Sequence, residues 1–269
     1  HRHGRDDRHM LAQPSRFLTP VVDHFEQVSV GPPGFDDAVM SGDQVGVLLA
    51  SHLIAAHQRA GGGAATVAKS IVSSRRMEAI AAAAGVGCVT TLTGFKWVAR
   101  PIVEVPDKPY LLGYEEALGY CVGGVVRDKD GISAALVAMQ MLSRLKDAER
   151  TVWDVLDELD KAHGAYRTHS FSVRLSADGP TTAEMLLQIL EEPPTAGSAV
   201  ERIVDLSSGE DLPPTTGVIV YYQDRTRLIV RPSGTEPKVK FYLEAIGTAA
   251  YAEEALQDLT GALKQGQLD

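Results

Sequence analysis

A polar turn, Arg231 to Lys238, separates two segments whose residue patterns are typical of strands. The first segment, Leu228 to Val230, is a continuous apolar run. In the second, Val239 to Ala245, apolar residues alternate with polar ones such as Glu244, which is the period of a strand with one buried face. The sequence therefore predicts two neighbouring strands joined by a turn that carries Arg, Ser, Thr and Lys side chains.

The residues of this turn suit the binding of a phosphate group. Arg231 offers a planar fork of donors, and Lys238 offers a point charge. The hydroxyls of Ser233 and Thr235 add neutral donors, and Gly234 lets backbone N–H groups approach a ligand closely. An ordinary strand connection, with Pro and Gly as turn residues, explains the same residues, so the chemistry alone leaves both interpretations open.

The string from Arg231 to Lys238 resembles the phosphate-binding loop of the phosphohexomutases, the family of phosphoglucomutase and phosphomannomutase. Earlier segments resemble the same family and occur in the family's order. Thr93 to Trp97 is similar to the loop before the sugar-recognition segment. Gly113 to Tyr120 is similar to the sugar-recognition loop itself, and Asp128 to Ile132 follows it. The resemblance covers about residues 39 to 269.

The resemblance implies which residues would hold a hexose phosphate. Glu115 and Glu116 would accept hydrogen bonds from sugar hydroxyls, because one carboxylate accepts from two neighbouring O–H groups; a solvated acidic pair is the alternative. Lys96 would either face the phosphosugar or be an exposed loop cation. The phosphate would be held by residues of the turn: Arg231, Ser233, Gly234, Thr235 and Lys238. Many relatives carry Ser where this chain has Ala117, so the choice between glucose and mannose stays open.

Composition and charge exclude several classes of protein. A hydrophobic content of 44% with 23% charged residues is typical of a soluble globular protein. A net charge of −9 argues against nucleic-acid binding and against an anionic membrane surface. No apolar run is long enough to span a bilayer. The two cysteines do not make a disulfide framework, so the sequence predicts a cytoplasmic protein. Residues 225 to 240, Arg227 among them, concentrate positive charge as an anionic sugar phosphate requires.

Helix and strand patterns predict two domains after an unmatched N-terminal segment, residues 1–38. Residues 39–150 alternate strand-like and helical segments, which favours an α/β mixed-sheet domain with mostly parallel strands. Residues 151–269 contain strands clustered around a few helices and predict a smaller α+β domain with the strand–loop–strand phosphate site. The resemblance makes these the third domain of the family, for sugar recognition, and the fourth, for phosphate binding.

The resemblance also implies parts that the sequence does not contain. The family transfers a phosphoryl group between C1 and C6 of a hexose with a phosphoserine, an Asp-rich loop for Mg²⁺, and hexose 1,6-bisphosphate as a cofactor. Neither the phosphoserine string nor the Asp-x-Asp-x-Asp spacing occurs here, and Asp36 and Asp37 alone would hold Mg²⁺ poorly. We therefore assign no catalytic residue and no metal ligand.

Three functions are compatible with the sequence. The first is a phosphoglucomutase or phosphomannomutase, an isomerase acting by intramolecular phosphotransfer, whose catalytic half is not part of this chain; the isolated chain is then weakly active at best. The second is a non-catalytic phosphosugar-binding module, and the third is an inactive remnant. The expected ligand of the first two is glucose phosphate or mannose phosphate. A surface left uncovered by absent domains predicts self-association.

Overall fold

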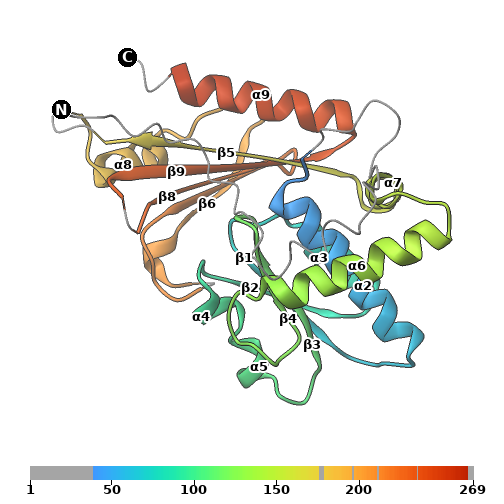
Figure 1. Ribbon diagram of the computed structural model, residues 1–269. Coiled ribbons are helices and arrows are strands. Elements are labelled where there is room, and N and C mark those ends of the chain that lie inside the picture. The colour runs from blue at the N-terminus through green and yellow to red at the C-terminus, as the bar shows by residue number, and fades with distance from the viewer. Residues whose placement is uncertain (1–38, 176–178, 196, 211, 235, 266–269) are drawn as a thin grey trace, which may run out of the picture. The chain divides into compact units, whose positions relative to one another are not determined.

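Two sheets organise the chain in the computed structural model, which describes residues 39–175, 179–195, 197–210, 212–234 and 236–265 (Figure 1). The first sheet has four strands and the second has five. None of the described helices has the length and apolarity that a bilayer span requires.

The first sheet is mixed, with the strand order β2-β1-β3-β4. Its strands are β1 (Thr66–Ser70), β2 (Gly87–Thr91), β3 (Tyr110–Glu115) and β4 (Gly119–Val122). β1 pairs in parallel with both β2 and β3, and β4 pairs antiparallel with β3. The helices of this region are α2 (Gly42–Arg59), α3 (Arg76–Ala83), α4 (Phe95–Val98), α5 (Pro101–Glu104), α6 (Gly131–Asp147) and α7 (Val152–His163).

Helices cover both faces of the first sheet. On one face, Val67 of β1 and Leu112 of β3 pack against apolar residues of α2, α3, α6 and α7. On the other face, Ala68 of β1 packs with Phe95 and Val98 of α4. Neighbouring residues of β1 thus point to opposite faces, as the two-residue period of a strand requires. The central strand β1 is fully buried, as is usual for an α/β sheet, whereas the edge strand β2 is only partly buried.

Capping boxes fix where α2 and α7 begin. The Ser41 hydroxyl accepts from Gln44 N at 3.2 Å, and Gln44 Oε1 accepts from Ser41 N at 2.8 Å. Thr151 and Asp154 make the same reciprocal pair at the start of α7, at 3.2 Å and 2.7 Å. Each box satisfies two backbone donors that the first helical turn leaves without partners.

The second sheet is antiparallel throughout, with the order β5-β9-β8-β7-β6. Its strands are β5 (Ala165–Arg174), β6 (Val200–Asp205), β7 (Val218–Tyr222), β8 (Arg227–Pro232) and β9 (Lys238–Gly247). Two helices, α8 (Thr182–Glu191) and α9 (Ala249–Gln265), accompany it, with a 3₁₀ turn η1 (Leu206–Ser208) after β6.

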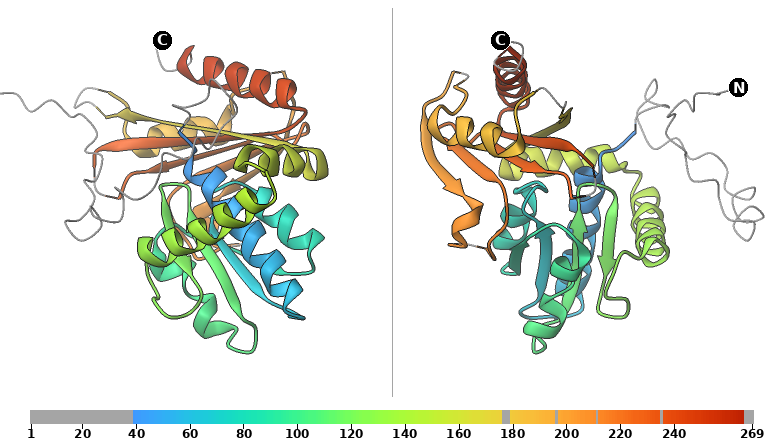
Figure 2. Two further views of the ribbon diagram at one scale, coloured as in Figure 1. Left: turned by 45° about the vertical axis from the view of Figure 1, so that its right-hand side comes forward. Right: turned by 90° about the vertical axis from the view of Figure 1, so that its left-hand side faces the viewer.

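The two faces of the second sheet meet different partners. Residues such as Val220 and Phe241 pack against α8 and α9. On the opposite face, Ile219 and Ile229 pack against Ile71, which follows β1. The views in Figure 2 agree with this, because α9 and the first sheet lie on opposite sides of the second sheet. The second sheet therefore covers the edge of the first sheet where β1 ends.

The predicted fold class, a mixed α/β domain followed by a domain built on a second sheet, is confirmed in outline. The predicted strands before and after the polar turn are β8 and β9, which pair antiparallel. β4 was not predicted. The domain boundary near residue 150 stays a prediction.

Candidate functional site

Loops from both domains meet at the edge of the first sheet where its parallel strands end. β1, β2 and β3 run in the same direction, so the loops after Ser70, Thr91 and Glu115 leave the sheet at one edge. Ligands of open α/β sheets bind outside the carboxyl ends of the strands. This edge is therefore the place where a site is expected, and it holds the predicted sugar-recognition loop.

Glu115, the last residue of β3, is tied to the loop after β2. Its Oε1 accepts a hydrogen bond from Gly94 N at 2.6 Å. Gly94 has φ of 106°, a backbone conformation that favours glycine, and it directly precedes α4. The carboxylate thus joins two of the segments that carry the family resemblance, and it keeps a second oxygen for other donors.

Glu116 faces the loop after β1. Its Oε2 lies 3.3 Å from the Ser70 hydroxyl and 3.4 Å from the Ser73 hydroxyl, and its N–H donates to Ser73 Oγ at 3.1 Å. Burial raises the pKa of Glu116, and the neighbouring carboxylate of Asp43 raises it further. Glu116 is therefore a half-buried acceptor held by hydroxyls, and its role in sugar binding stays a prediction.

Arg231, at the start of the polar turn, reaches the same loops. Its Nη1 donates to Thr93 Oγ1, next to the glycine that Glu115 holds. Tyr242 on β9 lies near Arg231, Glu115 and Glu116; burial raises its pKa to about 12, the carboxylates add to the rise, and Arg231 opposes it. The structure thus brings the predicted phosphate residue Arg231 and the predicted sugar residues into one neighbourhood.

A hollow of about 270 Å³ lies between the two domains beside this neighbourhood. Glu116 and Tyr242 line it, together with Thr168, His169 and Ser170 of β5. The lining combines two carboxylates, those of Glu116 and Asp43, with hydroxyls and an imidazole. These groups suit a ligand rich in hydroxyl groups.

The remainder of the polar turn is closed by its own backbone. Ser233 N donates to the Lys238 carbonyl at 2.8 Å, and Lys238 Nζ lies 2.5 Å from Glu236 Oε2. Gly234 is exposed, and a Cβ atom there would meet nothing within 4 Å. Thr235 lies outside the described residues. In this state the Lys238 charge is balanced by Glu236, so an anion that binds the turn must compete with that carboxylate.

Lys96 lies apart from this group. Its Nζ is 5.4 Å from the centroid of the Trp97 ring, and its side chain is exposed. It lines a separate open hollow of about 600 Å³ together with Trp97, Arg100 and Arg127, and the lining of that hollow does not include Glu115 or Glu116. This placement favours the exposed loop cation over a contact with the phosphosugar.

Family models match most of the described chain. Residues 41–162 match phosphoglucomutase/phosphomannomutase, alpha/beta/alpha domain III, and residues 173–261 match phosphoglucomutase/phosphomannomutase, C-terminal domain. This chain belongs to the phosphoglucomutase/phosphomannomutase family. Its membership confirms the resemblance drawn from the polar turn and the two earlier segments.

Named relatives of this phosphoglucomutase/phosphomannomutase chain are longer than it is. A probable phosphomannomutase of Haemophilus influenzae is 37% identical over 212 residues, which cover 77% of this chain and 41% of the relative. A probable phosphoribomutase of Schizosaccharomyces pombe is 32% identical over 82% of this chain and 41% of its own length. The chain thus spans about two fifths of the length of these relatives.

Solved structures of family members share the fold. Parafusin, a phosphoglucomutase from Paramecium, aligns with a TM-score of 0.60 and 22% identity over 85% of this chain and 40% of that chain. A putative phosphomannomutase from Thermus thermophilus aligns with a TM-score of 0.55 and 16% identity over 83% and 41%. At these identities the likeness establishes the architecture of a mixed α/β domain followed by a second sheet domain.

The described part of this family member does not fit a magnesium ion. Within it, no three His, Cys, Asp or Glu side chains are arranged to hold a metal. Mg²⁺ requires near-octahedral oxygen ligands. The carboxylates of Glu115 and Glu116 accept from Gly94 and from serines, and that of Asp43 accepts from Ser74 N and the Tyr114 hydroxyl. Asp36 and Asp37 lie outside the described residues.

Several residues of the site were not found from the sequence. Ser70 and Ser73 hold Glu116, Thr168 and His169 line the hollow, and Tyr242 lies between the domains. The loop after β1 could have been singled out, because it follows a parallel strand as the two recognised loops do. His169 and Tyr242 carried no signal, since each stands in a strand where a polar residue on the outer face is usual.

Proposed function

We propose that this chain is the substrate-recognition half of a phosphoglucomutase- or phosphomannomutase-type enzyme and that it binds a hexose phosphate where its two domains meet. The observation that carries this proposal is the convergence of the matched segments. Arg231 of the polar turn bonds to Thr93, the neighbouring Gly94 bonds to Glu115, and Glu116 lines a polar hollow between the domains. A ligand with a phosphate at one end and hydroxyls at the other matches this distribution of charge.

The polar turn would bind the phosphate. Arg231 supplies a fixed charge with several donors, and Lys238 supplies a second charge once it leaves Glu236. Ser233 and Thr235 would contribute hydroxyls, and Gly234 would let a backbone N–H approach the ligand. A hydrogen bond to a charged group contributes about 1.5–3 kcal/mol, so the loss of Arg231 should weaken binding about ten- to hundred-fold.

The sugar-recognition loop would bind the hexose ring. Glu115 and Glu116 each retain acceptor capacity, and the hollow beside Glu116 offers further hydroxyls and His169. Because burial raises the pKa of Glu116, hydroxyl donors from a sugar would favour its ionised form and lower that pKa on binding. Binding should therefore release protons when the pH lies near the raised pKa.

The chemical step belongs to the whole protein of this family rather than to the described residues. Phosphoryl transfer between C1 and C6 of the hexose, with Mg²⁺ and hexose 1,6-bisphosphate, would require a phosphoserine and a metal loop in addition to the groups found here. This chain's residues would bind and orient the substrate. We place the protein in the cytoplasm, since both of its cysteines are free.

Calorimetric titration with glucose 1-phosphate, mannose 1-phosphate and unphosphorylated glucose tests the proposal. We expect a hexose phosphate to bind, glucose to bind more weakly, and Arg231→Ala to lower the affinity for the phosphate about ten- to hundred-fold. Arg144→Ala is the matched control, because Arg144 is an exposed arginine near the end of α6. It should leave the affinity unchanged.

A mutase assay with Mg²⁺ and a catalytic amount of hexose 1,6-bisphosphate separates the remaining functions. Binding without turnover would support the recognition half or a binding module, whereas turnover abolished by Arg231→Ala would reveal a nucleophile that we have not identified. A folded chain that binds no hexose phosphate would leave only the inactive remnant.

A further inference from the structure

A buried cluster of charges lies where the two domains meet, away from the residues proposed to touch substrate. Glu244 of β9 is 1% exposed and Arg227 of β8 is 4% exposed, and they stand opposite each other in the sheet. Glu244 accepts from Arg75 N at 2.8 Å and from Arg75 Nε at 2.6 Å, and its Oε2 lies 3.3 Å from Arg227 Nη2. We call Arg75, Arg227 and Glu244 the junction cluster.

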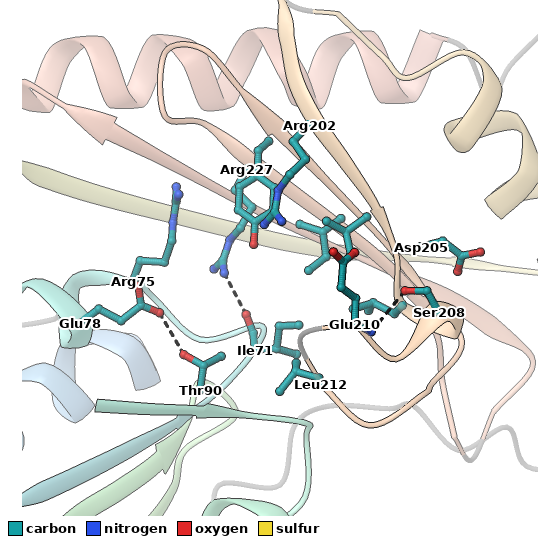
Figure 3. Close-up of a pocket in the computed structure, with 14 residues that line it drawn as sticks. Ile71, Arg75, Glu78, Thr90, Arg202, Asp205, Ser208, Glu210, Leu212 and Arg227 are labelled. Atoms are coloured by element: carbon teal, nitrogen blue, oxygen red, sulfur yellow. Dashed lines mark hydrogen bonds between the residues drawn. The ribbon is translucent and has the colours of Figure 1, made fainter. Parts of the chain in front are cut away.

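The junction cluster joins the second sheet to the loop after β1. Arg227 Nη1 donates to the Ile71 carbonyl at 3.0 Å, and its Nη2 donates to the Ser73 carbonyl at 3.1 Å. Figure 3 shows the Arg227 side chain extending from its strand to Ile71. Arg75 belongs to the first domain and places its backbone N–H and its guanidinium on the same carboxylate of β9. The domains are thus linked by directional bonds as well as by apolar contact.

Each end of this link leads to a proposed binding loop. Ser73, whose carbonyl Arg227 holds, uses its hydroxyl to contact the carboxylate and the N–H of Glu116. Arg231 follows Arg227 by four residues on β8, and residues an even number apart on a strand lie on the same face. The cluster therefore fixes the strand that carries Arg231 against the loop that carries Glu116.

The junction cluster sets one carboxylate between two guanidinium groups. Burial raises the pKa of Glu244, but Arg227 and Arg75 outweigh it and hold that pKa below its usual range. Glu244 is therefore ionised at neutral pH between two guanidinium groups. A well-packed apolar trio would hold two layers together at least as well as a buried ion cluster, so stability alone does not account for charges at this position. Their directional hydrogen bonds define one relative placement of the layers.

We propose that Arg75, Arg227 and Glu244 are positioning residues that set the spacing between the phosphate turn and the sugar-recognition loop. The inference rests on the proposed function, since the spacing matters only if one ligand contacts both loops. A misplacement of about 1 Å between binding groups can cost about a hundred-fold in function. Loss of the cluster should therefore weaken a ligand that reaches both loops and spare a ligand that reaches only one.

Two ligands separate positioning from general stability. Inorganic phosphate reaches only the polar turn, whereas glucose 1-phosphate and mannose 1-phosphate would reach both loops. For Glu244→Gln and Arg227→Met we expect the affinity for the preferred hexose phosphate to fall about ten- to hundred-fold. The affinity for inorganic phosphate, followed by NMR titration, should stay within about two-fold, and Arg227→Lys should recover part of the loss because it keeps the charge.

Asp160→Asn is the matched structural control. Asp160 of α7 forms partly buried ion pairs with Arg76 and Arg167, and it contacts neither binding loop through them. Its removal should lower the thermal stability without changing the ratio of the two affinities. Where Glu244→Gln does not fold, the pair Arg227→Met and Arg227→Lys provides the same comparison.

The outcomes are distinct. A selective loss of hexose-phosphate affinity in the cluster variants supports the inference. Equal losses for both ligands, folded variants with unchanged affinities, or the same selective loss in Asp160→Asn would overturn it. If the wild-type chain binds hexose phosphate no more tightly than inorganic phosphate, the proposed function is refuted, and the positioning role with it.

Discussion

A methyl group at Gly42 would collide with the sugar-recognition loop. Gly42 is the first residue of α2, and an added Cβ would lie 1.9 Å from the carbonyl oxygen of Glu116 and 3.0 Å from Leu118 N. The Tyr120 hydroxyl also donates to the Gly42 carbonyl at 3.2 Å, so the start of the helix is held where it is. Gly42→Ala therefore tests whether the loop is positioned by this approach.

The size of the effect follows from the distances. Cβ atoms essentially never come closer than 3.0 Å to another heavy atom, so the 1.9 Å approach must open by at least 1.1 Å. The obstacle is backbone, which cannot rotate away as a long side chain can. Overpacking of this kind costs about 1–3 kcal/mol. The gain from Ala over Gly in a helix is at most about 1 kcal/mol, so the variant should be destabilised.

The measurements are thermal unfolding and hexose-phosphate titration. A loss of 1 kcal/mol lowers the Tm by about 2–4 °C in a chain of this size, and a shift of the Glu116 loop by about 1 Å should weaken binding up to a hundred-fold. Gly131→Ala is the control, because Gly131 begins α6 and a Cβ there meets nothing within 4 Å. Unchanged stability and affinity in Gly42→Ala would refute the packing argument. A lower Tm with unchanged affinity would show that the loop does not bind the sugar.

Four further outcomes are expected from the described residues. Burial raises the pKa of the Cys88 thiol to about 12 and raises that of Cys121, so both should react slowly with a thiol reagent in the native protein and fast in urea. Phe241→Ala should cost about 3–5 kcal/mol in urea unfolding, since Phe241 is fully buried and stacks on a neighbouring ring at 4.8 Å; a loss below about 1 kcal/mol would contradict its place in the core. The pKa of Glu244 is held below its ordinary value of 4.5, so its contribution to stability is present above that value and is lost as the pH falls through the depressed pKa. As the pH falls below about 5, the free energy of unfolding of Glu244→Gln should therefore decrease less than that of the wild type. Leu136 is 53% exposed in an apolar stripe along α6, so light scattering should show self-association as the protein concentration rises. Leu136→Lys should reduce this association, and a monomeric wild-type profile would contradict the prediction.

Local patterns were sufficient to predict the elements that carry the site. The parallel strands are short segments between helical ones, and the polar turn stands between an apolar run and an alternating one. β4 was not predicted because Gly119–Val122 is short and begins with Gly, so its formation as a strand depends on pairing with β3. Strands with a clear hydrophobic pattern of their own could be predicted, whereas a strand that forms only by pairing with a neighbour could not.

Arg227 and Glu244 show where sequence reasoning stops. The alternation in β9 places Glu244 on the polar face of a half-buried strand, and Arg227 belongs to a run of cations between residues 225 and 240. Neither pattern predicts burial, yet the first domain covers that face and leaves Arg227 4% and Glu244 1% exposed. Arg75, which pairs with Glu244, is 169 positions from it in the chain. A short stretch of sequence around either residue therefore cannot reveal this ion pair.

Contact and spacing are separate requirements of the proposed site. A ligand held at two ends needs each set of binding groups and a fixed distance between them, and these two requirements are met by different residues. Arg231 and Glu116 would supply the contacts, while Glu244 and Arg227, which do not line the hollow beside Glu116, would set the distance. A substitution of Arg231 removes a contact and should lower the affinities for inorganic phosphate and hexose phosphate alike. A substitution that changes the spacing should lower only the affinity for hexose phosphate, the larger ligand. The ratio of the two affinities therefore identifies which requirement a substitution has removed.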